Sequence, residues 1–248
     1  MLGDGLAARD APPLLSTSGM EHVVRLRSAV TLLGRFPALA GVDLTVEPGE
    51  VVLLRGANGA GKSTLLRLCA GLLTPTTGEG VVLGHDLATA GGRRAVRRRV
   101  GLLAHATFLY DDLTVADNVR FWARAAGAEP ADAEAAMTRL GLDGRLADVP
   151  AARLSAGQRR RTSLAAMVSR RPELWLLDEP HAGLDAAGRD LVDELVGDAR
   201  SAGVTVLVAS HELERATGLA GREVVLAGGT VVEPPVVEPP VVGGTGVR

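Results

Sequence analysis

A nine-residue, glycine-rich stretch constrains the fold more than any other part of the chain. It reads GANGAGKST from position 56 to position 64 and fits the pattern G-x-x-x-x-G-K-[S/T]. The apolar run Val51–Arg55 before it favours a β-strand, and Lys62–Leu72 has the pattern of a helix. Glycines let a backbone turn its N–H groups inward, and the start of the helix adds partial positive charge. The stretch therefore predicts a phosphate-binding loop (P-loop) between a strand and a helix.

Lys62 and Ser63 give this loop its expected chemistry. Lys62 is the only lysine in the chain, whose other long basic side chains are all arginines. We expect its ammonium to reach the β- and γ-phosphates of a nucleotide, and the Ser63 hydroxyl to bind Mg²⁺. The predicted loop residues are Gly56, Ala57, Asn58, Gly59, Ala60, Gly61, Lys62, Ser63 and Thr64. The loop alone fits kinases, GTPases and many ATPases.

A pair of adjacent carboxylates follows another apolar run, Leu174–Leu177. These residues are Asp178 and Glu179. A carboxylate at the end of a buried strand can hold Mg²⁺, which is the role we expect of Asp178. Glu179 is then placed to polarise an attacking water as a general base.

The motif LSAGQ at positions 154–158 closely resembles the LSGGQ signature of ATP-binding-cassette (ABC) proteins, with alanine for the first glycine. Ser155 and the N–H groups of a helix that starts there can form a second anion site. One domain cannot direct this site and its own P-loop at the same γ-phosphate. The resemblance implies that two domains pack head to tail, so that Ser155, Gly157 and Gln158 of one domain bind the ATP of the other.

Further family marks stand in the expected order. Gly183-Leu184-Asp185 looks like the D-loop, which implies that Asp185 lies at the nucleotide. His211 looks like the switch histidine that contacts the γ-phosphate, and the resemblance makes it a catalytic residue beside Glu179. The resemblance runs from about Val24 to Pro234 and implies hydrolysis of ATP with Mg²⁺.

Two positions depart from the family pattern. Leu33 stands where many relatives carry a tyrosine that stacks on adenine, and leucine can cover a base by dispersion without π-stacking. Phe36 could substitute or could pack internally. His105 stands in place of the Q-loop glutamine, which in relatives contacts Mg²⁺ and relays the nucleotide state to the transmembrane partner. An imidazole nitrogen can serve there, although histidine side chains titrate near neutral pH; the alternative is a substitution without consequence.

Short β-branched runs alternate with helical stretches, which is typical of parallel strands joined by helices. With the resemblance, this order predicts an α/β fold: a P-loop NTPase core with a parallel sheet, an N-terminal antiparallel β region and an inserted helical subdomain. The expected strands are Val42–Val46, Val51–Arg55, Val81–Leu83, Val100–Leu103, Leu174–Leu177, Val204–Val208 and Val224–Leu226. The expected helices are Lys62–Leu72, Val115–Ala126, Ala131–Leu140, Ser155–Arg170, Ala187–Ala202 and His211–Ala220.

The predicted boundaries follow from composition and motif order. Residues 21–234 form the nucleotide-binding domain, whose helical subdomain spans about 107–152 and continues into the signature helix at 155–170. Residues 1–20 are expected to be a disordered extension, and 235–248 a disordered tail rich in proline and valine. Glycine-containing triplets at 48–50 and 78–80 are expected to end hairpins.

Bulk properties limit the partners. The formal net charge of −2 gives no electrostatic indication of nucleic acid, so the arginines between Arg93 and Arg99 are interpreted as a solvated face near a membrane partner. No apolar run is long enough for a membrane span. We expect a homodimer at the cytoplasmic face of the cell membrane, held there by a multi-span permease subunit. The single cysteine, Cys69, is expected to be a buried packing residue, and histidine spacing predicts no zinc site.

Three classes of ABC protein remain open: an ATPase subunit of a transporter, a soluble ATPase acting on ribosomes or DNA, and a cassette serving an assembly scaffold. One cassette and no heptad insertion favour the transporter. Within transporters, His105, the LSAGQ motif and LTVADNVRF at 113–121 resemble the haem-export ATPase of bacterial cytochrome c maturation. The ATPase subunit of a drug, lipid or other small-molecule exporter is the alternative.

Overall fold

A computed structural model describes residues 20–211 and 213–232. The expected tail at 235–248, and all of the expected N-terminal extension except Met20, lie outside the described residues.

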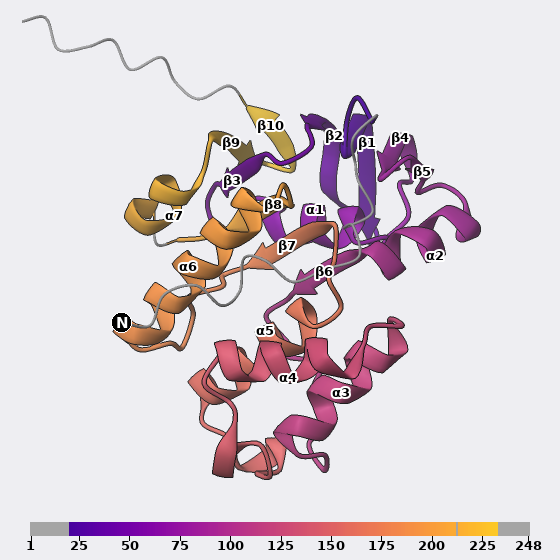
Figure 1. The fold of residues 1–248 in the computed structure, drawn as a ribbon. Helices are drawn as coiled ribbons and strands as arrows, with labels where there is room; N and C mark the ends of the chain where they lie inside the picture. Colours follow the sequence, from indigo (N-terminus) through magenta and orange to yellow (C-terminus); the bar gives the residue numbers. More distant parts are fainter. Residues whose placement is uncertain (1–19, 212, 233–248) are drawn as a thin grey trace, which may run out of the picture.

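A six-stranded sheet forms the centre of the fold (Figure 1). Its order is β10-β9-β3-β8-β7-β6, and its neighbours are parallel except for β9 and β10. The strands are β3 (Val51–Arg55), β6 (Val100–Leu103), β7 (Leu174–Asp178), β8 (Thr205–Ala209), β9 (Arg222–Ala227) and β10 (Thr230–Val232). Strands β7 and β8 are buried along their whole length, which explains their uninterrupted apolar sequences. The predicted parallel core is confirmed.

Alternate residues of β7 face two different apolar cores. Leu174 and Leu176 pack into a core shared with the antiparallel sheet and α1, whereas Trp175 and Leu177 pack into one shared with α3, α4 and α5. Cys69 lies in the first core, and burial raises the pKa of its thiol to about 12, which confirms its expected packing role.

The N-terminal region forms a four-stranded sheet of order β2-β1-β4-β5, which confirms the predicted antiparallel region. Its strands are β1 (Val24–Leu33), β2 (Phe36–Val46), β4 (Thr77–Val82) and β5 (His85–Asp86). The prediction that the triplet at 78–80 ends a hairpin is wrong, because it lies inside β4. Gly78 has φ +79° where the β1–β4 register shifts, and a Cβ there would lie 2.2 Å from the Ser28 carbonyl oxygen. The glycine therefore accommodates a bulge.

All six expected helices form within a few residues of their predicted ends. The helices are α1 (Lys62–Cys69), α2 (Ala90–Arg99), α3 (Val115–Ala125), α4 (Pro130–Arg139), α5 (Ala156–Val168), α6 (Ala186–Ser201) and α7 (Leu213–Leu219). Two short 3₁₀ turns, η1 (Gly144–Leu146) and η2 (Ala151–Arg153), precede α5. The sequence did not predict α2, which contains the arginine run.

Three arginines of α2 anchor the helix instead of forming a free basic face. Arg93 donates to the Leu87 carbonyl at 2.7 Å and Arg97 to the Gly71 carbonyl at 2.7 Å. Arg99 forms a bidentate ion pair with Glu173, with one N–O distance of 2.6 Å. The interpretation of the run as a solvated face is therefore wrong for Arg93 and Arg99, which are half-buried, whereas Arg94, Arg97 and Arg98 are exposed.

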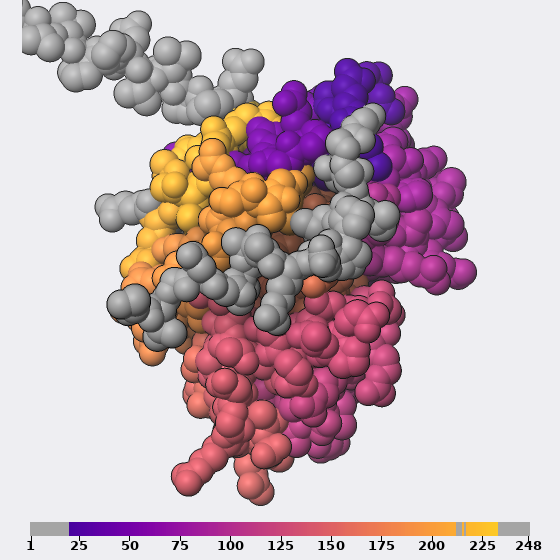
Figure 2. Space-filling model, in the orientation of Figure 1, coloured from indigo at the N-terminus to yellow at the C-terminus, as the bar shows by residue number. Residues whose placement is uncertain are grey.

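Helices α3 and α4 form a lobe at the end of the molecule opposite the antiparallel sheet, and α5 joins this lobe to β7 (Figures 1 and 2). Thr114 caps α3 by accepting from the Asp117 N–H, and Ser155 caps α5 by accepting from the Gln158 N–H. Among the described residues, no helix combines the length and the apolar composition needed to cross a membrane.

Candidate active site

A pocket of about 410 Å³ lies where β3, β6, β7 and β8 end at the carboxyl edge of the parallel sheet. This edge is where open α/β sheets hold their ligands. The pocket is lined by Leu33, Ala38, Asn58, Gly59, Ala60, Gly61, Lys62, Ser63, Thr64, His105, Asp178, Glu179 and His211. The structure thus gathers the P-loop, both carboxylates and both histidines around one space. Gly56 and Ala57 do not line the pocket, but their carbonyl oxygens accept hydrogen bonds from Lys62 in the same loop.

The P-loop leaves a helix N-terminus open toward the pocket. Gly61 precedes α1 with φ +108°, and no side chain caps the helix there. A Cβ on Gly61 would lie 2.8 Å from the Ala38 carbonyl oxygen, so the tight approach of the loop to β2 requires glycine. The first N–H groups of α1 are therefore available to an anion.

Lys62 is buried against its own loop. Its ammonium donates to the carbonyl oxygens of Gly56, at 2.7 Å, and Ala57, at 3.1 Å. These bonds hold the side chain along the loop, at the pocket wall. A positive charge in this position favours an anionic ligand.

The two carboxylates leave β7 in different backbone conformations. Asp178 is the buried last residue of the strand, whereas Glu179 has φ +49°, a left-handed conformation that non-glycine residues rarely adopt. One oxygen of the Glu179 carboxylate accepts from the main-chain N–H of His211 at 3.0 Å. The other oxygen lies 3.3 Å from Nε2 of the His211 side chain. The strained backbone and these contacts hold the Glu179 carboxylate beside His211, within the lining of the pocket.

The oxygen donors fit a magnesium ion that binds together with a nucleotide. Ser63 and Asp178 supply one hydroxyl and one carboxylate to the same pocket. Among the described residues, no group of three or more His, Cys, Asp or Glu side chains could hold a metal by itself. Magnesium is commonly held by one or two protein oxygens, with phosphates and water as the remaining ligands, so the set matches it.

The two departures from the family pattern both lie at the pocket. Leu33 and His105 line it. The exposed fraction of Phe36 is 79%, and the residue is not part of the lining, so Leu33 is the side chain positioned to cover a base.

The signature and D-loop residues lie outside this pocket. Ser155, Gly157, Gln158 and Asp185 are absent from its lining. Ser155 and Gln158 form a reciprocal capping box at the start of α5, and Asp185 caps α6 by accepting from the Gly188 N–H at 2.9 Å.

Comparison with known proteins shows the family. The family model described as "ABC transporter" matches residues 39–182, which is more than half of the chain. The chain belongs to the ABC transporter ATPase family. As a member, it is an ATP-hydrolysing enzyme.

Several curated relatives resemble this ABC ATPase. The cytochrome c biogenesis ATP-binding export protein CcmA of Bradyrhizobium diazoefficiens is 39% identical over 202 residues, covering 82% of this chain and 96% of that protein. The methionine import ATP-binding protein MetN of Caulobacter vibrioides is 40% identical over 212 residues, covering 83% of this chain and 64% of that protein.

Among solved structures, a dimeric bacterial ABC transporter cassette matches with a TM-score of 0.78 at 26% identity. The match covers 85% of this chain and 97% of that chain. The predicted ABC cassette fold is thus confirmed.

Two features of the ABC ATPase were not predicted from the sequence. The first is Arg160 of α5, whose guanidinium is buried against the backbone that follows β6 and β7. The only available signal was its place in the buried stripe of α5, with Ser163, Leu164 and Met167 at helical spacing.

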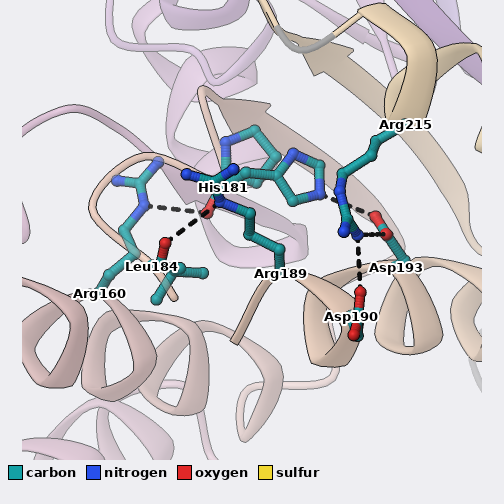
Figure 3. Close-up of polar contacts among 8 residues, drawn as sticks. Arg160, His181, Leu184, Arg189, Asp190, Asp193 and Arg215 are labelled. Atoms are coloured by element: carbon teal, nitrogen blue, oxygen red, sulfur yellow. Dashed lines mark hydrogen bonds and ion pairs between the residues drawn. The ribbon is translucent and has the colours of Figure 1, made fainter. Parts of the chain in front are cut away.

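The second missed feature is a set of polar contacts that joins His181, Asp193 and Arg215 (Figure 3). His181 is buried, and its Nε2 lies 2.8 Å from an oxygen of Asp193 in α6. Arg215 of α7 donates to the other oxygen of Asp193 at 2.7 Å and to Asp190 at 2.8 Å. These contacts link the segment after Glu179 to α7, the helix after His211.

A second, apolar groove of about 370 Å³ lies between β6, α3 and α5. Ala104, Ala106 and Thr107 line it, whereas His105 between them lines the nucleotide pocket. Trp122 also lines the groove, and Phe121 is exposed and stacks edge-on against Tyr110. The segment 104–107 thus forms part of both the apolar groove and the nucleotide pocket.

Proposed function

We propose that this ABC ATPase binds Mg-ATP in the pocket, dimerises around ATP and drives export through a multi-span permease subunit at the cytoplasmic face of the cell membrane. The observation that carries the proposal is the gathering of the P-loop, Asp178, Glu179 and His211 around one space. These side chains supply what phosphoryl transfer to water needs: charge neutralisation, a metal ligand and a base.

Each side chain has a role that its position supports. The N–H groups of α1 and the Lys62 ammonium bind the β- and γ-phosphates, while Ser63 and Asp178 hold Mg²⁺. When bound, Mg²⁺ neutralises phosphate charge. The Glu179 carboxylate accepts the proton of the attacking water, and His211 orients that carboxylate and contacts the γ-phosphate.

The dimer completes the site. Ser155, Gly157 and Gln158 serve as an anion site, and these residues and Asp185 lie outside the lining of the nucleotide pocket in the described part of the same chain. A second copy packed head to tail supplies its P-loop ATP to this site. The likeness to dimeric ABC cassettes supports this arrangement.

The apolar groove supports a membrane partner. A short amphipathic helix of the permease fits a groove of this size and apolar lining. Since residues 104–107 line both the groove and the pocket, the partner would respond to the nucleotide through His105.

Haem export for cytochrome c biogenesis is the cargo reaction we propose. The CcmA relative is matched along 96% of its length, whereas MetN is matched along 64%. Export of a drug, a lipid or another small molecule is the alternative. Pull-down from solubilised membranes tests the class, because a multi-span permease should co-purify, whereas ribosomes or DNA would indicate a non-transport ATPase.

Glu179→Gln tests the hydrolytic role. The amide keeps the size of the side chain but removes the base, so ATP affinity should stay within about twofold while turnover falls by at least about 100-fold. Steady-state hydrolysis at the wild-type rate would remove Glu179 as the base.

A further inference from the structure

Among the described residues, no carboxylate side chain is a hydrogen-bond partner of the buried cation Arg160. The exposed fraction of the residue is 5%, and its guanidinium donates to main-chain carbonyl oxygens. Burial lowers the pKa of Arg160, while the nearby charges of Asp178 and Glu179 act in the opposite direction. Arginine nonetheless stays protonated. A buried charge satisfied only by carbonyl groups points to a positional role for those carbonyls.

The carbonyls belong to two loops that line the nucleotide pocket. Nη1 donates to Ala104, the residue before His105, at 2.6 Å. Nη2 donates to Asp178 at 2.5 Å and to Glu179 at 2.6 Å. Nε lies 3.4 Å from the Pro180 oxygen, the contact drawn from Arg160 in Figure 3. The planar fork therefore fixes the loop after β6 relative to the end of β7.

We infer that Arg160 is a positioning residue that sets the Glu179 carboxylate and the His105 side chain relative to the nucleotide. This inference rests on the proposed role of Glu179. The left-handed backbone of Glu179, with φ +49°, is strained, so it needs outside contacts to persist. The two Nη2 bonds, to the carbonyls of the two peptide groups that flank the Glu179 Cα, supply such contacts. Arg160 also lies on α5, whose N-cap is Ser155.

Because the inference depends on the forked geometry of the guanidinium, replacement of Arg160 by lysine tests it directly. Lysine keeps the charge but has a single donor centre, so it cannot hold both loops with the same geometry. In the full-length Arg160→Lys variant, single-turnover hydrolysis should slow by about tenfold or more, since small misplacements of reacting groups have effects of that size. The Kd for ATP should stay within about twofold, because Arg160 does not line the pocket.

Hydrogen exchange tests the same inference without an activity assay. Amide exchange should rise in 103–107 and 178–182 together and stay unchanged in α1. Arg159→Lys is the matched control: Arg159 lies on the same helix and donates to the Ala151 carbonyl at 2.8 Å, away from both loops. It should keep the wild-type rate and exchange pattern.

Three results would overturn the inference. They are an Arg160→Lys rate within twofold of wild type, a parallel loss of ATP affinity, and global unfolding of the variant, which would indicate a purely structural arginine. Glu179→Gln, measured in parallel, separates this from failure of the proposed function. If Glu179→Gln turns over normally the base assignment fails, whereas a dead Glu179→Gln with a normal Arg160→Lys removes only the role of Arg160.

Discussion

The starts of α1 and α5 use the same physical device in two different ways. Both helices present their first N–H groups and partial positive charge to their surroundings. The start of α1 has no side-chain cap and opens into the pocket. The start of α5 is closed by a capping box between Ser155 and Gln158 and lies outside the pocket.

Under the proposed function, one chain carries two unlike halves of a nucleotide site. The half at the start of α1 is open, and a ligand bound to the same chain completes it. The α5 half is stable alone, because Ser155 accepts the Gln158 N–H; its hydroxyl can still donate a proton outward, since a hydroxyl is both donor and acceptor. We expect that donor to meet the phosphate of a second copy.

Ser155→Asp should have the largest effect, because it keeps the cap and reverses the charge. Asp caps helices about as well as Ser, so the melting temperature should hold. The carboxylate should repel the partner's γ-phosphate, lowering turnover by about 100-fold or more with ATP affinity of the monomer unchanged. Thr114→Asp, at the start of α3, is the control and should keep wild-type turnover. Normal turnover in Ser155→Asp would contradict the role of the α5 start.

Lys62→Ala should act on the other half of the comparison. Removal of the ammonium deletes a charge-assisted contact to phosphate, so the Kd for ATP should rise by about 10- to 100-fold. Isothermal titration with Mg-ATP measures this directly. An unchanged Kd would separate Lys62 from the phosphate.

Gly61→Ala should destabilise the open helix start. The methyl group would meet the Ala38 carbonyl at 2.8 Å in a left-handed backbone, which should lower the melting temperature by about 2–8 °C. Gly59→Ala is the matched control, because its φ is +78° but nothing lies within 4 Å. Equal shifts in the two variants would show that the backbone conformation matters and the close contact does not.

His105→Gln should have the smallest effect, because the residue belongs to neither helix start. Glutamine can place an amide on the same pocket wall, so kcat should stay within about threefold of wild type. Steady-state hydrolysis at saturating Mg-ATP is the measurement. A drop comparable to that of Ser155→Asp would make the imidazole itself essential.

The sequence predicted the parts of the site that are local in the chain. The P-loop, the Asp178–Glu179 pair and the Ser155 cap each lie within one short segment, and the strand ends bring His105 and His211 to the same edge. Arg160 could not be predicted, because its partners come from residues 104 and 178–180, which only the fold brings together. Helix α2 was missed because two glycines follow its first residue, Ala90, and Val96 is its only buried residue.

The central claim is that two copies share each ATP, and the mass of the Glu179→Gln protein in solution tests it most directly. Without hydrolysis, the ATP-bound state should accumulate. Light scattering after gel filtration should give a dimer with Mg-ATP and a monomer with ADP, while Glu179→Gln combined with Ser155→Asp should bind ATP and stay monomeric. A Glu179→Gln protein that is saturated with ATP yet monomeric at every concentration would contradict the shared site.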